Sequence, residues 1–213
     1  MKIAIIGATG LVGAPLLREA IGRGHRIAAL VRHPEKVPAH PQVSAAAIDA
    51  YDEASVAGQV AGRDAVISAF SPGYADPELY RHYLQGVRTI IAGVVRAGVA
   101  RLLMVGGAGS LEVAPGVQLV DTPEFPAEWR PTALAAREAL HILRGESPLD
   151  WTYLSPPMLL EPGERTGAYR VGGDQLLTDA SGASRISLED YAVAMLDELE
   201  RPRHSRTRFT VAY

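Results

Sequence analysis

Residues 3–13, with the sequence I-A-I-I-G-A-T-G-L-V-G, place three glycines between a β-branched run and a helical pattern. Gly7 permits a tight turn after the strand, Gly10 lets the backbone approach a pyrophosphate, and Gly13 lets the helix pack closely. The free amides and the positive end of that helix would then face the phosphates. Because the triplet lies in strand, turn, helix, strand order, it predicts a dinucleotide-binding turn rather than a plain connection.

Strand-like and helical segments alternate through the first three quarters of the chain. We expect strands at 2–6, 26–31, 43–48, 65–70, 102–105 and 151–155, with helices at 11–23, 53–61 and 77–97 and an alanine- and leucine-rich segment at 127–144. Strands that alternate with helices require crossover connections, and therefore a parallel sheet covered on both faces. The predicted fold class is α/β, a Rossmann-type doubly wound parallel sheet.

The pattern changes after Pro157. Short segments punctuated by glycine run to residue 183, followed by an extended stretch at 185–187, a helix at 188–200 and a final strand at 207–213. Ser187, three residues before Asp190, is typical of a helix N-cap. No linker separates two units, so we expect residues 1–213 to form one NAD(P)-binding domain, in which the tail from about 158 contributes a small substrate lobe.

The composition excludes several classes of protein. With 213 residues, 47% apolar and 21% charged, the chain can bury a continuous core. It has no cysteine, which excludes disulfides, thiolate nucleophiles and sulfur-based zinc sites, and indicates a cytoplasmic location. The net charge of −3 argues against nucleic acid as a partner. The six histidines show no H-x-x-x-H spacing, so no metal is expected.

The longest apolar run, 3–17, contains three glycines and a proline. It is shorter than the roughly 20 residues that a membrane span requires. A signal peptide is the competing interpretation, because Lys2 precedes apolar residues. Strand, glycine turn and helix explain the same run better, so we expect neither a leader nor a membrane partner.

The end of the second predicted strand bears on which dinucleotide binds. Sites that prefer NAD usually carry an acidic residue there, whereas this chain has A-L-V-R-H at 29–33. Arg32 suits the 2′-phosphate of NADP, with His33 beside it; the alternative is a solvated arginine. Asp49, after the third strand, either binds the adenine edge or caps a turn.

Four motifs indicate a family. They are the G-x-x-G-x-x-G turn, V-G-G-A-G-S-L at 105–111, D-W-T-Y-L-S-P-P at 150–157 and P-G-E-R-T-G-A-Y-R at 162–170. Together they resemble the NmrA-like NAD(P)-binding group of atypical short-chain dehydrogenases/reductases, which includes NADH-flavin reductases and is similar to flavin reductases of the biliverdin reductase B type. The resemblance extends to the terminal R-F-T-V-A-Y and so covers the whole chain.

The resemblance implies a set of site residues at the carboxyl ends of the predicted strands, where doubly wound sheets bind ligands. The residues that it assigns to the pyrophosphate are Gly7, Thr9, Gly10, Leu11, Val12 and Gly13. It assigns Arg32 and His33 to the adenosine phosphate, and Asp49 and Ala50 to the adenine. The residues for the ribose and nicotinamide side are Ala69, Phe70, Gly107, Ala108, Pro156, Pro157 and Met158, and the active-site hydroxyl is that of Ser110.

The chain departs from standard short-chain dehydrogenases in one respect. Those enzymes use a Tyr-x-x-x-Lys pair for proton exchange, but none of the eight tyrosines here has a lysine four positions later. Arg137, near the place where many NmrA-like proteins keep a lysine, stays protonated and is a poor proton shuttle. A flavin acceptor removes the difficulty, because hydride moves from nicotinamide C4 to flavin N5 and water supplies the proton.

These observations predict an NAD(P)H-dependent oxidoreductase that prefers NADP over NAD, takes a flavin, quinone or similar planar molecule as substrate, and works as a monomer or homodimer. Flavin would be a substrate rather than a bound prosthetic group, and Arg165 and Arg170 either attract its phosphate or form exposed ion pairs. A non-catalytic, NmrA-like redox sensor that acts through a partner protein is the alternative. Nucleotide-sugar epimerisation is a third, weaker hypothesis, because it needs the missing pair.

Overall fold

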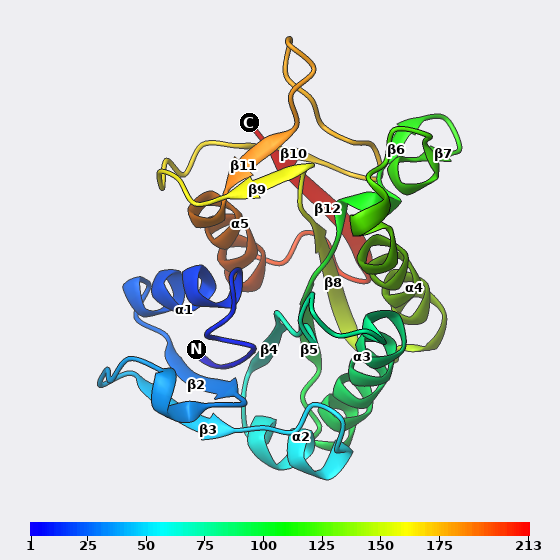
Figure 1. Cartoon of the computed structure of the whole chain (residues 1–213). Helices are drawn as coiled ribbons and strands as arrows, with labels where there is room; N and C mark the ends of the chain where they lie inside the picture. Colours follow the sequence, from blue (N-terminus) through cyan, green and yellow to red (C-terminus); the bar gives the residue numbers. More distant parts are fainter.

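The computed structural model describes the backbone of residues 1–213 and every side chain except that of Glu146. Its centre is an eight-stranded sheet in the order β10-β12-β8-β5-β4-β1-β2-β3, in which only the edge strand β10 is antiparallel to its neighbour (Figure 1). The strands are β1 Lys2–Ile6, β2 Arg26–Val31, β3 Val43–Ala47, β4 Ala65–Ser68, β5 Arg101–Val105, β8 Asp150–Ser155, β10 Arg170–Gly172 and β12 Thr207–Ala212.

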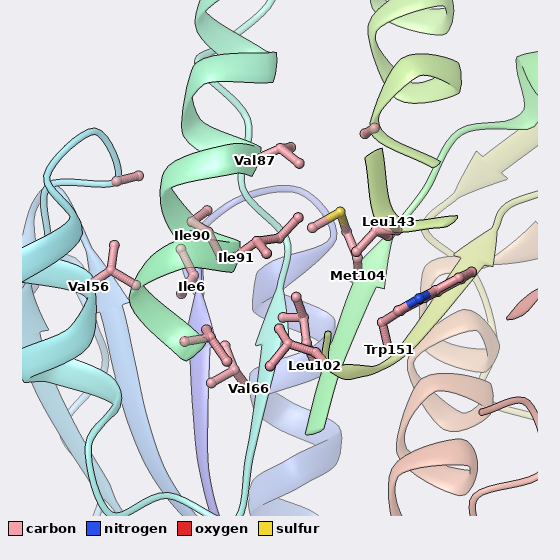
Figure 2. Close-up of a cluster of buried hydrophobic side chains, with 14 of the residues drawn as sticks. Ile6, Val56, Val66, Val87, Ile90, Ile91, Leu102, Met104, Leu143 and Trp151 are labelled. Carbon is pink, nitrogen blue, oxygen red and sulfur yellow. The ribbon is translucent and has the colours of Figure 1, made fainter. Parts of the chain in front are cut away.

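Helices cover both faces of this sheet, as a doubly wound fold requires (Figure 1). They are α1 Gly13–Gly22, α2 Glu53–Val60, α3 Leu79–Arg96, α4 Arg130–Glu146 and α5 Leu188–Glu200. Helices α1 and α5 pack together on one face, and α2, α3 and α4 pack side by side on the other. Figure 2 shows the second face, where Val87 and Ile90 of α3 and Leu143 of α4 lie among side chains of the central strands. The predicted α/β fold is therefore confirmed.

The helices differ in whether a side chain caps their first turn, and this affects which of them can bind a ligand. The Asp52 carboxylate caps α2 by accepting a hydrogen bond from the Ala54 amide at 2.9 Å. The Ser187 hydroxyl caps α5 by accepting one from the Asp190 amide at 2.9 Å, as the sequence predicted. Helix α1 has no side-chain cap at Val12. Its first turn is consequently left to a ligand or to water.

The segments between 106 and 129, and those after 158, are less regular than the sheet. They contain the hairpin β6 Glu112–Ala114 and β7 Val117–Gln118, the parallel pair β9 Leu159–Glu161 and β11 Arg185–Ser187, and the 3₁₀ turns η2 Ala108–Ser110, η3 Leu119–Asp121 and η4 Ala127–Trp129. The segment expected at 127–144 thus begins as a 3₁₀ turn and becomes α-helical at Arg130. The strand expected at 65–70 ends at Ser68.

A buried carboxylate holds the loop at 166–167 and the C-terminal tyrosine against α5. Asp190 of α5 is fully buried and accepts hydrogen bonds from the amides of Thr166 and Gly167 at 2.9 and 2.7 Å. The Tyr213 hydroxyl donates to the same carboxylate at 2.8 Å. Among the residues described, no helix combines the length and apolar character needed to cross a membrane.

Candidate functional site

A cavity of about 1410 Å³ runs along the carboxyl ends of β1, β2, β4, β5 and β8. This is the edge of the sheet where the strand order reverses around β1 and β4, the usual ligand site of a doubly wound fold. Cavities that hold one small molecule measure roughly 300 to 1,000 Å³, so this cavity has room for a dinucleotide and a second molecule.

The glycine turn forms the floor of the cavity at β1. Gly7 has a φ of +80°, and a Cβ atom there would lie 2.5 Å from the carbonyl oxygen of Ala69. A Cβ atom on Gly13 would lie 2.0 Å from the carbonyl oxygen of Gly7, so glycine is required for α1 to approach the turn. Among the described hydrogen bonds, none uses the backbone amides of Leu11 or Val12, which line the cavity. The uncapped start of α1 fits the pyrophosphate of a dinucleotide.

Cationic side chains surround one end of the cavity, beyond β2. Arg32 and Lys36 are exposed, line the cavity, and make no hydrogen bond or ion pair with any side chain that the structure describes. His33 lies 3.2 Å from the Glu35 carboxylate. Asp49 lines the same end, and its carboxylate accepts the Tyr51 amide at 2.9 Å. Asp49 therefore caps a turn at the cavity wall.

An aromatic row follows the cavity wall from this end toward the middle of the sheet. The Phe70 ring meets Tyr51 edge to face at 5.8 Å and stacks on Tyr83 of α3 at 6.1 Å. The ring of Phe70 occupies a space that a Cβ atom on Gly86 would fill, since that atom would lie 2.3 Å from it. Gly86 of α3 is thus what allows Phe70 to lie against the helix.

The carboxyl ends of β5 and β8 form the apolar middle of the cavity. Gly106, Gly107, Pro156 and Pro157 line it, and the Tyr153 ring lies directly behind Gly106. The Tyr153 hydroxyl donates to the Ala136 carbonyl at 2.7 Å, and complete burial raises the pKa of this phenol. This tyrosine is therefore a protonated part of the wall and not a general base.

A second group of apolar side chains forms the rim away from the glycine turn. Tyr74 and Trp129 meet edge to face at 5.5 Å and are 65% and 49% exposed. Phe125, with the Arg130 guanidinium 5.8 Å from its ring centre, and Met158, 55% exposed, complete the rim. Beyond residue 158, only residues 159–161 line the cavity. Most of this rim is therefore formed by residues between 119 and 136 and not by the tail.

The structure brings together nearly all the residues that the sequence nominated. The cavity is lined by Gly7, Thr9, Gly10, Leu11, Val12, Arg32, His33, Asp49, Ala50, Ala69, Phe70, Gly107, Ala108, Pro156, Pro157 and Met158. Gly13, which the resemblance assigned to the pyrophosphate, does not line the cavity, because it packs α1 against the turn, the other role that the sequence predicted for it.

Ser110 requires a correction. It is 3% exposed, does not line the cavity, and its hydroxyl accepts a hydrogen bond from the buried Arg208 guanidinium at 3.3 Å. Arg208 also pairs with Asp174 and donates to the Ser155 hydroxyl at 3.4 Å. The Ser110 hydroxyl is therefore part of a buried network behind the wall, and this position does not support its expected catalytic role.

Three arginines considered at the sequence level also lie away from the cavity. Arg165 donates two hydrogen bonds to Glu19 at 2.7 and 2.9 Å. Arg170 donates to the carbonyl groups of Thr178 and Tyr213. Arg137 pairs with Asp121 at 2.9 Å. None of the three lines the cavity. The positions of Arg165 and Arg170 therefore favour structural ion pairs and hydrogen bonds over capture of a flavin phosphate, and Arg137 does not stand at the site in place of the missing lysine.

Several residues that line the cavity were not predicted from the sequence. Lys36 could have been predicted, because it is a second cation only four residues after Arg32 and close to the end of the same strand. Tyr51, Tyr74, Tyr83 and Trp129 gave no such signal, because they lie on loops and helices whose packing the sequence pattern does not specify. Among the described side chains, no group of three histidine, aspartate or glutamate residues could hold a metal ion.

Known proteins resemble this chain in sequence and fold over its whole length. The Bacillus subtilis protein YwnB, which is uncharacterized, is 44% identical over 214 residues, covering 99% of this chain and 98% of YwnB. A Bacteroides thetaiotaomicron structure, provisionally assigned as an epimerase, is 46% identical with a TM-score of 0.94, covering 100% of this chain and 96% of its own. A Streptococcus pneumoniae structure, provisionally assigned as an NADH-flavin reductase, is 35% identical with a TM-score of 0.87, covering 100% and 99%.

A family model described as NAD(P)H-binding matches residues 7–199, which include the glycine turn, six of the eight strands of the main sheet and all but the last residue of α5. In agreement with the NmrA-like resemblance of its motifs, the chain belongs to the NAD(P)H-binding family of Rossmann proteins.

Proposed function

We propose that the protein is an oxidoreductase that prefers NADPH and transfers hydride to a flavin or another planar acceptor, without a Tyr-Lys pair. The observation that carries the proposal is the continuous cavity of about 1410 Å³. One end of it has the glycine turn and the cations Arg32 and Lys36, and the other end has an apolar, aromatic rim. Its two ends match the two halves of such a reaction: a charged dinucleotide and a flat, weakly polar ring system.

The cofactor half of the cavity has the groups that NADPH requires. The unpaired amides of Leu11 and Val12 would bind the pyrophosphate, and the exposed Arg32 and Lys36 would bind the 2′-phosphate. Ala69 and Phe70 would lie along the ribose and nicotinamide. Arg32 stands directly after β2, where sites that prefer NAD usually carry an acidic residue, and this favours NADPH over NADH.

The acceptor half of the cavity suits a reaction that needs positioning more than acid-base catalysis. When bound, the reduced nicotinamide supplies hydride, which carries two electrons to the acceptor, and water supplies the accompanying proton. Pro156, Pro157 and the rim aromatics exclude competing water and hold a flat ring parallel to the cofactor site.

The relatives agree with this proposal in part. The Streptococcus pneumoniae structure carries a flavin reductase assignment, and it matches this chain over its full length. The epimerase assignment of the Bacteroides structure is less compatible, because epimerisation needs the proton exchange that a Tyr-Lys pair provides.

The test is the initial rate of NADPH and NADH oxidation, measured side by side with FMN, riboflavin and a quinone by loss of nicotinamide absorbance and corrected for the uncatalysed reaction. We expect saturable turnover that favours NADPH. Tight NADPH binding without turnover would overturn the enzymatic proposal and favour a redox sensor that acts through a partner protein.

A further inference from the structure

The hydroxyl of Tyr83 differs from those of the other buried tyrosines. Tyr153 and Tyr191 donate to the backbone carbonyls of Ala136 and Leu154, each at 2.7 Å. Tyr83 is 8% exposed, yet no hydrogen bond among the described residues involves its hydroxyl. The chain therefore supplies no partner for this hydroxyl, which is left to water or to a molecule in the cavity.

The Tyr83 hydroxyl is accessible from the cavity. Three side-chain nitrogens are fully enclosed and make no hydrogen bond among the described residues, and they belong to His25, Arg63 and Arg101; the His25 nitrogen lies 2.9 Å from the Glu200 carboxylate. The Tyr83 oxygen is not among them, so it retains exposed surface, and Tyr83 is part of the cavity wall. A molecule in the cavity can therefore reach this oxygen.

The ring that carries this hydroxyl is held rigidly. Tyr83 stacks on Phe70 with an interplanar angle of 26°, and Phe70 is in turn fixed against Gly86. Tyr83 also belongs to the buried apolar cluster under α3 and α4. A donor held in this way loses little conformational freedom when it binds a ligand.

The chemistry of the group favours donation. Burial, with a smaller effect from the neighbouring Tyr74, raises the pKa of Tyr83 to about 12. The phenol keeps its proton throughout the neutral range, so it offers an O–H donor and not a negative charge. Tyr51 contacts Phe70, and Phe70 contacts Tyr83, so Tyr83 lies at the inner end of the aromatic row that begins at the cationic end of the cavity.

We propose that the Tyr83 hydroxyl binds the acceptor, by donating a hydrogen bond to a carbonyl oxygen or ring nitrogen of the planar molecule that lies against the rim. This inference rests on the proposed function. It specifies the substrate class: the acceptor carries a hydrogen-bond acceptor on an otherwise apolar ring, as an isoalloxazine or a quinone does. It also supplies the polar group that Ser110 cannot provide from behind the wall.

The test compares Tyr83→Phe with Tyr80→Phe. Both remove one hydroxyl from α3, but Tyr80 is 44% exposed and lies outside the cavity. We expect Tyr83→Phe to lower kcat/KM for FMN and for a quinone by about 3- to 10-fold, the effect of one neutral hydrogen bond. The Kd for NADPH, measured by titration calorimetry, should change by less than about 2-fold, and Tyr80→Phe should match the unmodified protein.

Two results would overturn the inference. One is an unchanged kcat/KM for every acceptor in Tyr83→Phe. The other is an equal weakening of NADPH binding, which would make the hydroxyl a cofactor ligand instead. Melting temperature and circular dichroism of the variant show whether the fold is intact, and the retained ring preserves the contact with Phe70.

A binding measurement separates this inference from the proposed function. If the unmodified protein turns over no acceptor, the enzymatic proposal fails, and quenching of riboflavin fluorescence in the presence of NADP⁺ still reports whether a flat ring binds. Weaker quenching with Tyr83→Phe would support the role of the hydroxyl without turnover. Equal quenching by both proteins, or none, would contradict it.

Discussion

Arg32 and Lys36 are the side chains whose chemistry bears most directly on the choice of cofactor. Both are exposed at the end of the cavity beyond β2, and neither is paired with a described carboxylate. A guanidinium without a protein partner binds a phosphate without first breaking an ion pair, and the cost is limited to lost hydration and side-chain freedom. The 2′-phosphate is the feature that distinguishes NADPH from NADH, so the effect of these residues should be confined to NADPH.

Arg32→Ala should weaken NADPH binding by about 1.5 to 3 kcal/mol, the usual strength of a charge-assisted hydrogen bond, and leave NADH nearly unchanged. Titration calorimetry with both cofactors measures the difference. Arg26→Ala is the matched control, since Arg26 is an exposed arginine at the opposite end of the same strand, β2. Equal losses for NADPH and NADH would disprove the assignment of Arg32 to the 2′-phosphate.

At the scale of elements, the contact between the glycine turn and the start of α1 decides whether a phosphate can approach. The Gly10 amide donates to the Gly7 carbonyl at 2.9 Å, and α1 begins close to that same carbonyl. A side chain on Gly13 would displace the helix from the turn. The positive end of α1 and its free amides would then point away from the pyrophosphate.

Gly13→Ala should therefore reduce NADPH affinity by at least about 10-fold and lower the melting temperature, since its Cβ atom would lie 2.0 Å from the Gly7 carbonyl oxygen. Gly22→Ala is the control within α1, because a Cβ atom there meets no other atom within 4 Å. Its affinity should be unchanged. If Gly13→Ala does not fold, Gly10→Ala, whose Cβ atom would lie 3.2 Å from the same oxygen, provides the comparison. Normal NADPH binding by a folded variant would refute this account of the turn.

For the whole molecule, the free energy of unfolding should depend on pH, because several carboxylates accept hydrogen bonds only in the folded state. Burial alone would raise the pKa of Asp190, but the hydrogen bonds from Thr166, Gly167 and Tyr213 outweigh it and hold the pKa below its ordinary value. Hydrogen bonds and arginine partners likewise lower the pKa of Glu19 and Asp174. Because these pKa values are lower in the folded state, the stabilisation is present above about pH 4 and is lost as the pH falls further.

Urea unfolding at pH 7 and pH 3 tests this dependence. The free energy of unfolding should be lower at pH 3, and Asp190→Asn should lower it by about 1 to 3 kcal/mol at pH 7 because buried donors lose their charged partner. The gap between the variant and the unmodified protein should narrow at pH 3, because the unfolded chain then binds a proton at this carboxyl and the advantage of the ionised carboxylate in the folded state decreases. A gap of equal size at both pH values would show that the charge of Asp190 is irrelevant.

Cofactor binding should also stabilise the entire fold, because the cavity is lined by five strands of one sheet. At a concentration 100 times its Kd, NADPH should add about 2.7 kcal/mol to the free energy of unfolding. For a chain of this size that corresponds to a rise in melting temperature of roughly 5 to 10 °C. Differential scanning fluorimetry with NADPH and NADH at equal concentration should show the larger rise with NADPH, and no rise with either would contradict dinucleotide binding.

The sequence by itself determined the alternating fold, the glycine turn and the cofactor end of the cavity. These features depend on local rules: a period of hydrophobicity, glycines that a turn requires, and residues that directly follow a strand. The start of β1, the extent of α5 and the Ser187 cap agree with the predicted bounds. Because every parallel strand ends at the same edge of the sheet, residues such as Arg32, Asp49 and Pro156 had to meet there.

Only the tertiary structure decided the acceptor end. Ser110 follows β5 just as the resemblance requires, yet the buried Arg208, about a hundred positions later in the sequence, draws its hydroxyl behind the wall. Tyr83 and Trp129 come from different helical segments and meet the cavity through packing. Whether a hydroxyl faces a ligand or a neighbouring side chain depends on contacts between distant residues, and these contacts form only when the layers of the fold come together.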